Sequence, residues 1–147
     1  ATMGIGLSPT IMPTTGAKSF ELADGEMEIG IGIHGEPGIH RGPLETADGI
    51  AERIVTALLD DLDLTAGDRV AVLVNGMGAT PMEELYVLFR QVHRMLTGLG
   101  IVIAKNYVGE YATSLEMAGA SISFLKLDDA RLGLLEARAK SPFFEEV

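Results

Sequence analysis

Two continuous apolar runs constrain the fold of this chain more than any other feature. They span residues 70–74 and 101–104, within strands expected over residues 69–75 and 101–107, and β-branched apolar runs of this kind are typical of strands buried on both faces. Between them, residues 80–97 carry apolar side chains at helical spacing, with Thr80 as the expected N-cap of the helix. A strand, a helix and a second strand form a right-handed crossover when the strands are parallel. The sequence therefore predicts a parallel strand pair in an α/β fold.

The remaining elements are predicted from the period of the apolar side chains. Helices are expected over residues 47–61, 114–118 and 129–139, the last capped by Asp128, and strands over residues 28–34 and 121–127. Residues 2–20 contain two prolines, which favour a loop or a short edge strand there. The expected fold is a single α/β unit with a mixed sheet of about five or six strands and helices on both faces.

The composition excludes several classes of protein. The chain has 147 residues with 11 Lys and Arg against 21 Asp and Glu, and the resulting net charge of −10 repels nucleic-acid phosphates. Its apolar runs are shorter than the roughly 20 residues that span a bilayer, so no membrane segment is expected. Because the chain has no cysteine and no histidine pair at helical spacing, neither disulfides nor a metal site are expected. These features suit a cytoplasmic protein.

The strand expected over residues 28–34 carries the best candidate for chemistry. Three isoleucines alternate there with two glycines and His34. Because glycine weakens a strand interior, two glycines beside an imidazole indicate space for a small ligand or a second backbone. The residues expected at this site are Gly30, Gly32, His34, Gly35 and Glu36, with Glu36 near enough in sequence to orient the ring. A structural histidine, partly exposed and without chemistry, would explain the same pattern and stays open.

A second glycine-containing segment, residues 75–79, precedes the helix expected over residues 80–97. Backbone N–H groups at a helix N-terminus can hold an anion. The segment lacks the glycine spacing of a dinucleotide site and the lysine of a P-loop. Two interpretations of this segment therefore remain open. It contacts a phosphate or a partner, or it is a plain turn from strand to helix.

Several segments together resemble a known family. The segment at residues 26–39 reads EMEIGIGIHGEPGI, and it resembles the substrate-histidine segment of the dihydroxyacetone kinases. Further resemblance follows in the order of that family, at residues 4–9, 67–81, 109–111, 113–119 and 125–129. The resemblance implies that residues 1–147 are the second subdomain of the substrate-binding unit. We therefore expect a longer protein, with an upstream subdomain that supplies a glycine-rich loop and the acid/base residues.

The resemblance also implies a role for His34. In that family the matching histidine attacks the ketone carbon of dihydroxyacetone and forms a hemiaminal. An imidazole with its ordinary pKa of about 6.5 is mostly neutral at pH 7 and can act as a nucleophile. The chain is thus expected to bind the ketose for a kinase that makes dihydroxyacetone phosphate, and to be inactive alone.

Cofactor and partners are implied in the same way. No cofactor is expected on this chain, because ATP with Mg²⁺, or a nucleotide charged by a phosphotransferase system, would bind a separate helical domain or subunit. The expected partners are that domain, the upstream subdomain and a second copy in a homodimer, since a short edge strand near residues 2–7 would need covering. A paralogue without catalysis, which binds the ketose as a sensor or co-activator, is the alternative function. Erythrulose is an alternative ketose.

Overall fold

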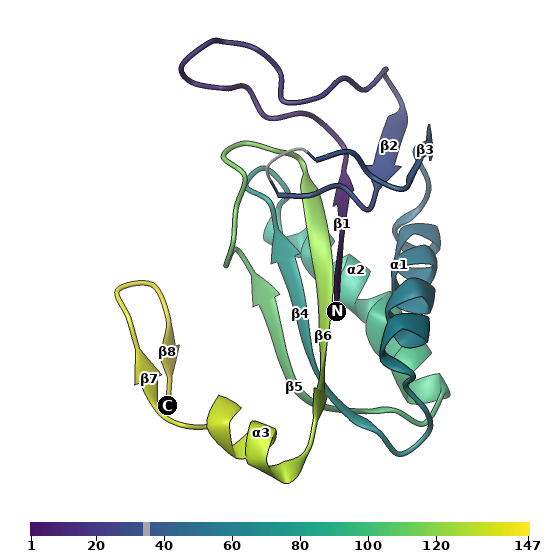
Figure 1. Cartoon of the computed structure of the whole chain (residues 1–147), viewed down its shortest axis with the longest axis vertical. Coiled ribbons are helices and arrows are strands. Elements are labelled where there is room, and N and C mark those ends of the chain that lie inside the picture. The colour runs from purple at the N-terminus through teal and green to yellow at the C-terminus, as the bar shows by residue number, and fades with distance from the viewer. Residues whose placement is uncertain (34–35) are drawn as a thin grey trace.

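A mixed six-stranded sheet forms the centre of the molecule (Figure 1). The computed structural model describes residues 1–33 and 36–147, and the strand order is β3-β2-β1-β6-β4-β5. The strands of this sheet are β1 (Thr2–Gly6), β2 (Glu26–Ile29), β3 (His40–Pro43), β4 (Arg69–Gly76), β5 (Val102–Gly109) and β6 (Gly119–Leu127). The other elements are the helices α1 (Ala47–Leu62), α2 (Met82–Gly98) and α3 (Asp129–Leu135), and a hairpin of β7 (Ala139–Lys140) and β8 (Glu145–Glu146). The predicted α/β class and mixed sheet are confirmed.

Strand β4 lies inside the sheet and is the most buried part of it. It pairs in parallel with β5 and antiparallel with β6. Helix α2 connects β4 to β5 and packs against both. The side chains of Val70, Val72 and Val74 on β4 are fully buried, because alternate residues of a strand point to one face and α1 and α2 cover that face. The predicted parallel pair with its helical crossover is confirmed.

The two long helices share one face of the sheet. Helices α1 and α2 pack against each other, α1 on β1 and β6 and α2 on β4 and β5 (Figure 1). Alternate strand residues, such as Val72, Ile122 and Phe124, form the core beneath them. The short helix α3 follows the end of β6. Its Leu135 lines a pocket together with Leu73. This pocket lies on the second face of the sheet, which is turned away from α1 and α2. Helices are thus divided unevenly between the two faces. Within the described residues, none of them combines the length and apolar character needed to cross a membrane.

Two local predictions are wrong because distant segments determine those structures. Strand β1 is not an edge strand, since it pairs with β2 on one side and β6 on the other. The exposed-edge argument for a homodimer therefore does not hold. Residues 114–118 form a turn and not a helix. The Ser114 N–H donates to the carbonyl of Met77, and the Thr10 hydroxyl donates to the carbonyl of Ser114 at 2.5 Å.

The helix ends were predicted with mixed success. Helix α1 begins at Ala47 as expected, and Asp128 caps α3 by accepting a hydrogen bond from the Arg131 N–H at 2.7 Å. Thr80 does not cap α2. Its hydroxyl donates to the carbonyl of Gly119 at 2.7 Å and accepts from the N–H of Gly119 at 2.9 Å, and Pro81 occupies the N-cap position. Helix α3 ends at Leu135, before the expected residue 139, and the chain continues into β7.

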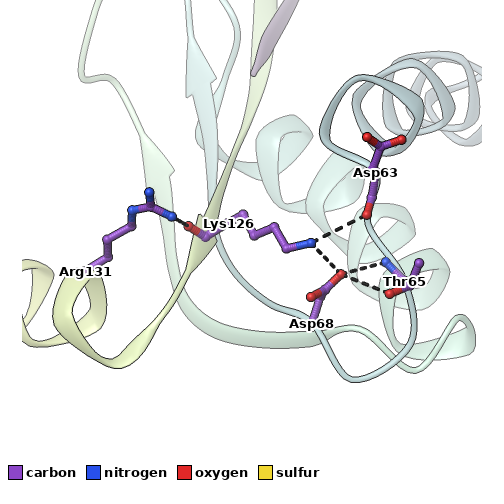
Figure 2. Close-up of polar contacts among 5 residues, drawn as sticks. All are labelled: Asp63, Thr65, Asp68, Lys126 and Arg131. Atoms are coloured by element: carbon purple, nitrogen blue, oxygen red, sulfur yellow. Dashed lines mark hydrogen bonds and ion pairs between the residues drawn. The ribbon is translucent and has the colours of Figure 1, made fainter.

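A charged cluster ties β6 to the turn between α1 and β4, as Figure 2 shows. The Lys126 Nζ donates to Asp68 Oδ2 at 2.9 Å, and the same oxygen accepts from the Thr65 N–H at 2.8 Å. Lys126 also reaches the carbonyl of Asp63, and its own carbonyl accepts from Arg131. The hydrogen bonds from Lys126 and Thr65 hold the pKa of Asp68 below its ordinary value, because they favour the carboxylate.

Candidate functional site

The strand predicted over residues 28–34 ends early and gives way to a loop. Strand β2 stops at Ile29, and Gly30 has a φ of +85°, a conformation that glycine adopts at little cost. A Cβ at Gly30 would lie 3.0 Å from the backbone nitrogen of Ile39, so the outgoing and returning segments cross closely there. The Gly30 N–H donates to the carbonyl of Gly4 at 2.7 Å. The predicted alternation along one straight strand is therefore wrong beyond Ile29.

His34 and Gly35 lie outside the described residues, and their roles stay predictions. On either side of them, the Gly32 N–H donates to the carbonyl of Glu36 at 3.1 Å. The Glu36 side chain lies against Gly32, where an added Cβ would be only 2.0 Å from Glu36 Oε2. The space that the sequence predicts beside Gly32 is thus occupied by the Glu36 carboxylate.

A pocket of about 540 Å³ opens on the second face of the sheet, beside this loop. Its size falls within the range of small-molecule sites. Its wall includes Gly30, Gly32 and Ile33 from the loop, Asn75 from β4, and Ser121 and Ser123 from β6. Because Ile33 directly precedes His34 in the chain, the pocket adjoins the segment that carries the predicted nucleophile.

Glu28 is a buried charge next to this loop, and the sequence analysis did not identify it. Its side chain is only 6% exposed. Oε1 accepts from the Gly38 N–H at 2.6 Å, and Oε2 accepts from Arg41 Nε at 3.1 Å and Nη2 at 2.5 Å. Burial by itself raises the pKa of Glu28, but the hydrogen bond from Gly38 and the Arg41 guanidinium outweigh it and hold the pKa below its ordinary value. No local spacing signals this pair, since it depends on the register between β2 and β3.

Asn75 fixes another part of the pocket wall. Its side chain is buried, and Oδ1 accepts from the N–H groups of Tyr111 and Ala112, both at 2.8 Å. Nδ2 donates to the carbonyl of Ala112 at 2.8 Å. Ala112 lines the pocket, so the carboxamide of Asn75 holds that wall in place. The available signal was a polar residue that closes an apolar run.

Comparison with known proteins identifies the family. The profile of the Dak1 domain matches residues 1–143. The chain belongs to the Dak1 domain family. One similar protein is the dihydroxyacetone-binding subunit DhaK of the PTS-dependent dihydroxyacetone kinase 2 of Listeria innocua, 43% identical over 97% of this chain. Another is the corresponding subunit of the PEP-dependent dihydroxyacetone kinase of Escherichia coli, 38% identical over 95% of this chain. The chain spans 43% and 46% of the lengths of these two relatives.

Solved structures similar to this Dak1 domain come from two kinds of protein. The dihydroxyacetone kinase operon co-activator Dha-DhaQ matches 89% of this chain and 41% of its own, with a TM-score of 0.82 and 34% identity. The dihydroxyacetone kinase from C. freundii, in complex with AMP-PNP and Mg²⁺, matches 92% of this chain and 25% of its own, with a TM-score of 0.73 and 25% identity. The resemblance to dihydroxyacetone kinases that the motifs indicated is confirmed.

The glycine-containing segment at residues 75–79 of this Dak1 domain begins with the last two residues of β4 and then leads toward α2, and an anion or partner contact there stays a prediction. The Met77 N–H donates to the carbonyl of Gly119 at 3.2 Å, and the Ala79 N–H donates to the carbonyl of Met117 at 3.1 Å. These donors are therefore already used within the fold. Across residues 1–33 and 36–147, no group of three or more His, Asp or Glu side chains could hold a metal ion.

Proposed function

We propose that this Dak1 domain binds dihydroxyacetone, or a similar short ketose such as erythrulose, through a reversible covalent bond to His34. The lone pair of one ring nitrogen forms a bond to the ketone carbon, and the carbonyl π bond breaks. The former carbonyl oxygen gains a proton while the ring loses the proton of its other nitrogen, so the hemiaminal forms without a leaving group. Glycerol has no carbonyl carbon and cannot form this bond.

The pocket beside Ile33 carries this proposal. Gly30, Gly32 and Ile33 line this pocket next to the segment that contains His34, and Ser121 and Ser123 also belong to its wall. Even the best tiny ligands gain only about −1.5 kcal/mol per atom from noncovalent contacts. A covalent bond supplies affinity that a small ketose lacks. We assign Gly30, Gly32, Gly35 and Glu36 to the substrate side of the site.

The proposed reaction is phosphoryl transfer to the bound ketose, which gives dihydroxyacetone phosphate. In support, the names of two relatives describe PTS- and PEP-dependent kinases, and a similar solved kinase is in complex with AMP-PNP and Mg²⁺. We assign the donor, either ATP with Mg²⁺ or a nucleotide charged by a phosphotransferase system, to a separate domain or subunit. An upstream subdomain supplies the acid/base residues. The complete protein is expected to be a cytoplasmic homodimer.

A second candidate function is ketose sensing without phosphoryl transfer. It is favoured by the higher TM-score of the co-activator Dha-DhaQ, 0.82 against 0.73 for the C. freundii kinase, and by its higher identity. A sensor needs the covalent bond to the ketose but not the acid/base residues. The two functions therefore make the same prediction for His34 and differ in turnover.

The test is carbon-13 NMR of the complete protein with dihydroxyacetone labelled at its carbonyl. We expect a new tetrahedral-carbon signal that requires the protein and differs from the signals of the free ketone and its hydrate. This new signal should be absent with His34→Ala, and labelled glycerol should give only its free signal. A wild-type protein that binds the ketose without the tetrahedral signal would contradict the covalent mechanism. Formation of dihydroxyacetone phosphate with a phosphoryl donor then separates the kinase from the sensor.

A further inference from the structure

We propose that the Glu28–Arg41 pair is a positioning device for the ketose site, which fixes the returning segment of residues 36–39 to β2 beside the pocket. The inference rests on the proposed function. Neither side chain lines the pocket beside Ile33, so neither is expected to touch the ketose. Their effect passes through the backbone of the loop.

Glu28 joins three parts of the structure. Glu28 and Arg41 are direct cross-strand partners in the register of β2 and β3, and the carboxylate also accepts the Gly38 N–H at 2.6 Å. The loop lies so close to β2 at this point that a Cβ at Gly38 would be 2.3 Å from the carbonyl oxygen of Ile29. The Ile39 N–H then donates to that carbonyl at 2.8 Å. The returning end of the loop is therefore fixed to β2 by side-chain and backbone contacts.

The contacts continue from this fixed end to the pocket. Pro37, with its restricted φ, joins Gly38 to Glu36. The Glu36 carbonyl accepts the Gly32 N–H at 3.1 Å, and its side chain fills the space beside Gly32. Gly32 is part of the pocket wall. A shift at Gly38 is therefore transmitted to the wall through two residues, without any change in the core under α1 and α2.

A displacement of this kind affects bond formation more than folding. A nucleophile must approach its carbon to roughly 3–3.5 Å, and a misplacement of about 1 Å can cost on the order of a hundredfold in rate. The Glu28→Gln variant keeps the shape of the side chain and an acceptor for Gly38, but it removes the charge that holds Arg41. We expect the ketose affinity to fall by about tenfold or more.

The experiment compares matched variants of the complete protein. Glu28→Gln, Arg41→Met and the double variant are titrated with carbonyl-labelled dihydroxyacetone, and the tetrahedral-carbon signal gives both the affinity and the exchange rate of the adduct. Asp68→Asn is one control, because Asp68 also accepts a backbone N–H and a cation but belongs to the far cluster of Figure 2. Glu26→Gln is the other. Glu26 lies on β2 two residues from Glu28, and its carboxylate accepts the Ala23 N–H at 3.0 Å.

We expect Glu28→Gln to weaken adduct formation while both controls bind as the wild type does. Arg41→Met should give a smaller loss, because the Gly38 N–H still donates to a charged carboxylate, and a hydrogen bond to a charged acceptor is stronger than one to the amide of Gln. Arg41→Met also serves as the test if Glu28→Gln does not fold. The double variant should lose no more affinity for the ketose than Glu28→Gln alone, because both variants remove the same ion pair.

The inference is overturned if Glu28→Gln and Arg41→Met form the adduct as the wild type does, or if Asp68→Asn weakens it equally. If the wild type itself forms no adduct, the proposed function fails first, and the positioning role falls with it.

Discussion

Two carboxylates of this protein have the same kinds of partner in different places. Glu28 accepts the N–H of Gly38 and pairs with Arg41, while Asp68 accepts the N–H of Thr65 and pairs with Lys126. Both have a pKa below the ordinary value, because their partners favour the charged form. The side chain of Glu28 is 6% exposed and that of Asp68 is 22% exposed.

The difference lies in what each carboxylate holds. Asp68 fixes the turn between α1 and β4 to β6 (Figure 2), and that contact at Lys126 is three residues, roughly 10 Å, along β6 from the pocket residue Ser123. Glu28 fixes a loop that forms part of the pocket wall. The same ion-pair chemistry thus serves stability at one end of the sheet and, on our proposal, geometry of the site at the other.

The largest expected effect is that of Gly38→Ala in the pocket loop. The new Cβ would lie 2.3 Å from the Ile29 carbonyl oxygen and 2.8 Å from Glu28 Cγ, so the loop backbone or β2 must shift to accommodate it. We expect a loss of about 3 kcal/mol in the free energy of unfolding, measured by urea denaturation. A loss below about 1 kcal/mol would show that the loop can separate from β2 without cost to the fold.

The second largest loss of stability is expected when the buried carboxylate of Glu28 is replaced. Glu28→Ala leaves the Gly38 N–H without its acceptor and Arg41 without its partner, and we expect a loss of about 1–3 kcal/mol. Asp68→Ala should cost less, because water can reach its partners more easily. Thermal unfolding of the two variants side by side checks the order, and equal losses would remove the distinction in burial on which the comparison depends.

A smaller effect is expected at Gly67, the counterpart of Gly38 in the turn held by Asp68. Gly67 has a φ of +90°, yet a Cβ there would have nothing within 4 Å. Gly67→Ala should therefore cost about 1 kcal/mol, from backbone strain alone. The urea midpoint measures this loss. A loss equal to that of Gly38→Ala would contradict the view that, of these two glycines, Gly38 alone has no room for a Cβ.

The smallest effect is a dependence on pH. A carboxylate whose pKa is lowered on folding stabilises the protein above its unfolded pKa, about 4.3 for Glu, and the contribution is lost as the pH falls through the folded value. The stability difference between wild type and Glu28→Gln should be constant above about pH 5 and shrink below about pH 4. Urea titrations at several pH values measure it. A difference that grows on acidification would mean that Glu28 is protonated in the folded protein.

Much of the fold could be predicted because its signals are local. The apolar run around Val72 gave a buried strand, the period around Ile54 gave α1, and Asp128 gave a cap, and each reflects residues close together in the chain. Thr80 was assigned wrongly as a cap for a related reason. A hydroxyl before a helix is a good local signal for a cap. The Thr80 hydroxyl instead bonds the backbone of Gly119, 39 residues away in the chain.

The candidate site divides in the same way. The segment around His34 was identified from its motif, and the family to which the motif pointed is confirmed. Asn75 was seen only as the end of a strand and the start of a loop, and Glu28 was not identified. Their partners, Ala112 and Arg41, are set by the packing of separate segments, which no spacing in the sequence reveals.

The sequence by itself determined the α/β class, the parallel pair of β4 and β5, and the resemblance to the dihydroxyacetone kinases, because periodicity and motifs are written in consecutive residues. Only the tertiary structure decided that β1 lies inside the sheet, that β2 ends at Ile29, and that Glu28 meets Arg41 beside the pocket loop. The physical reason is that strand order and register arise from pairing between distant segments, and a shift of one residue in register would turn Glu28 to the opposite face.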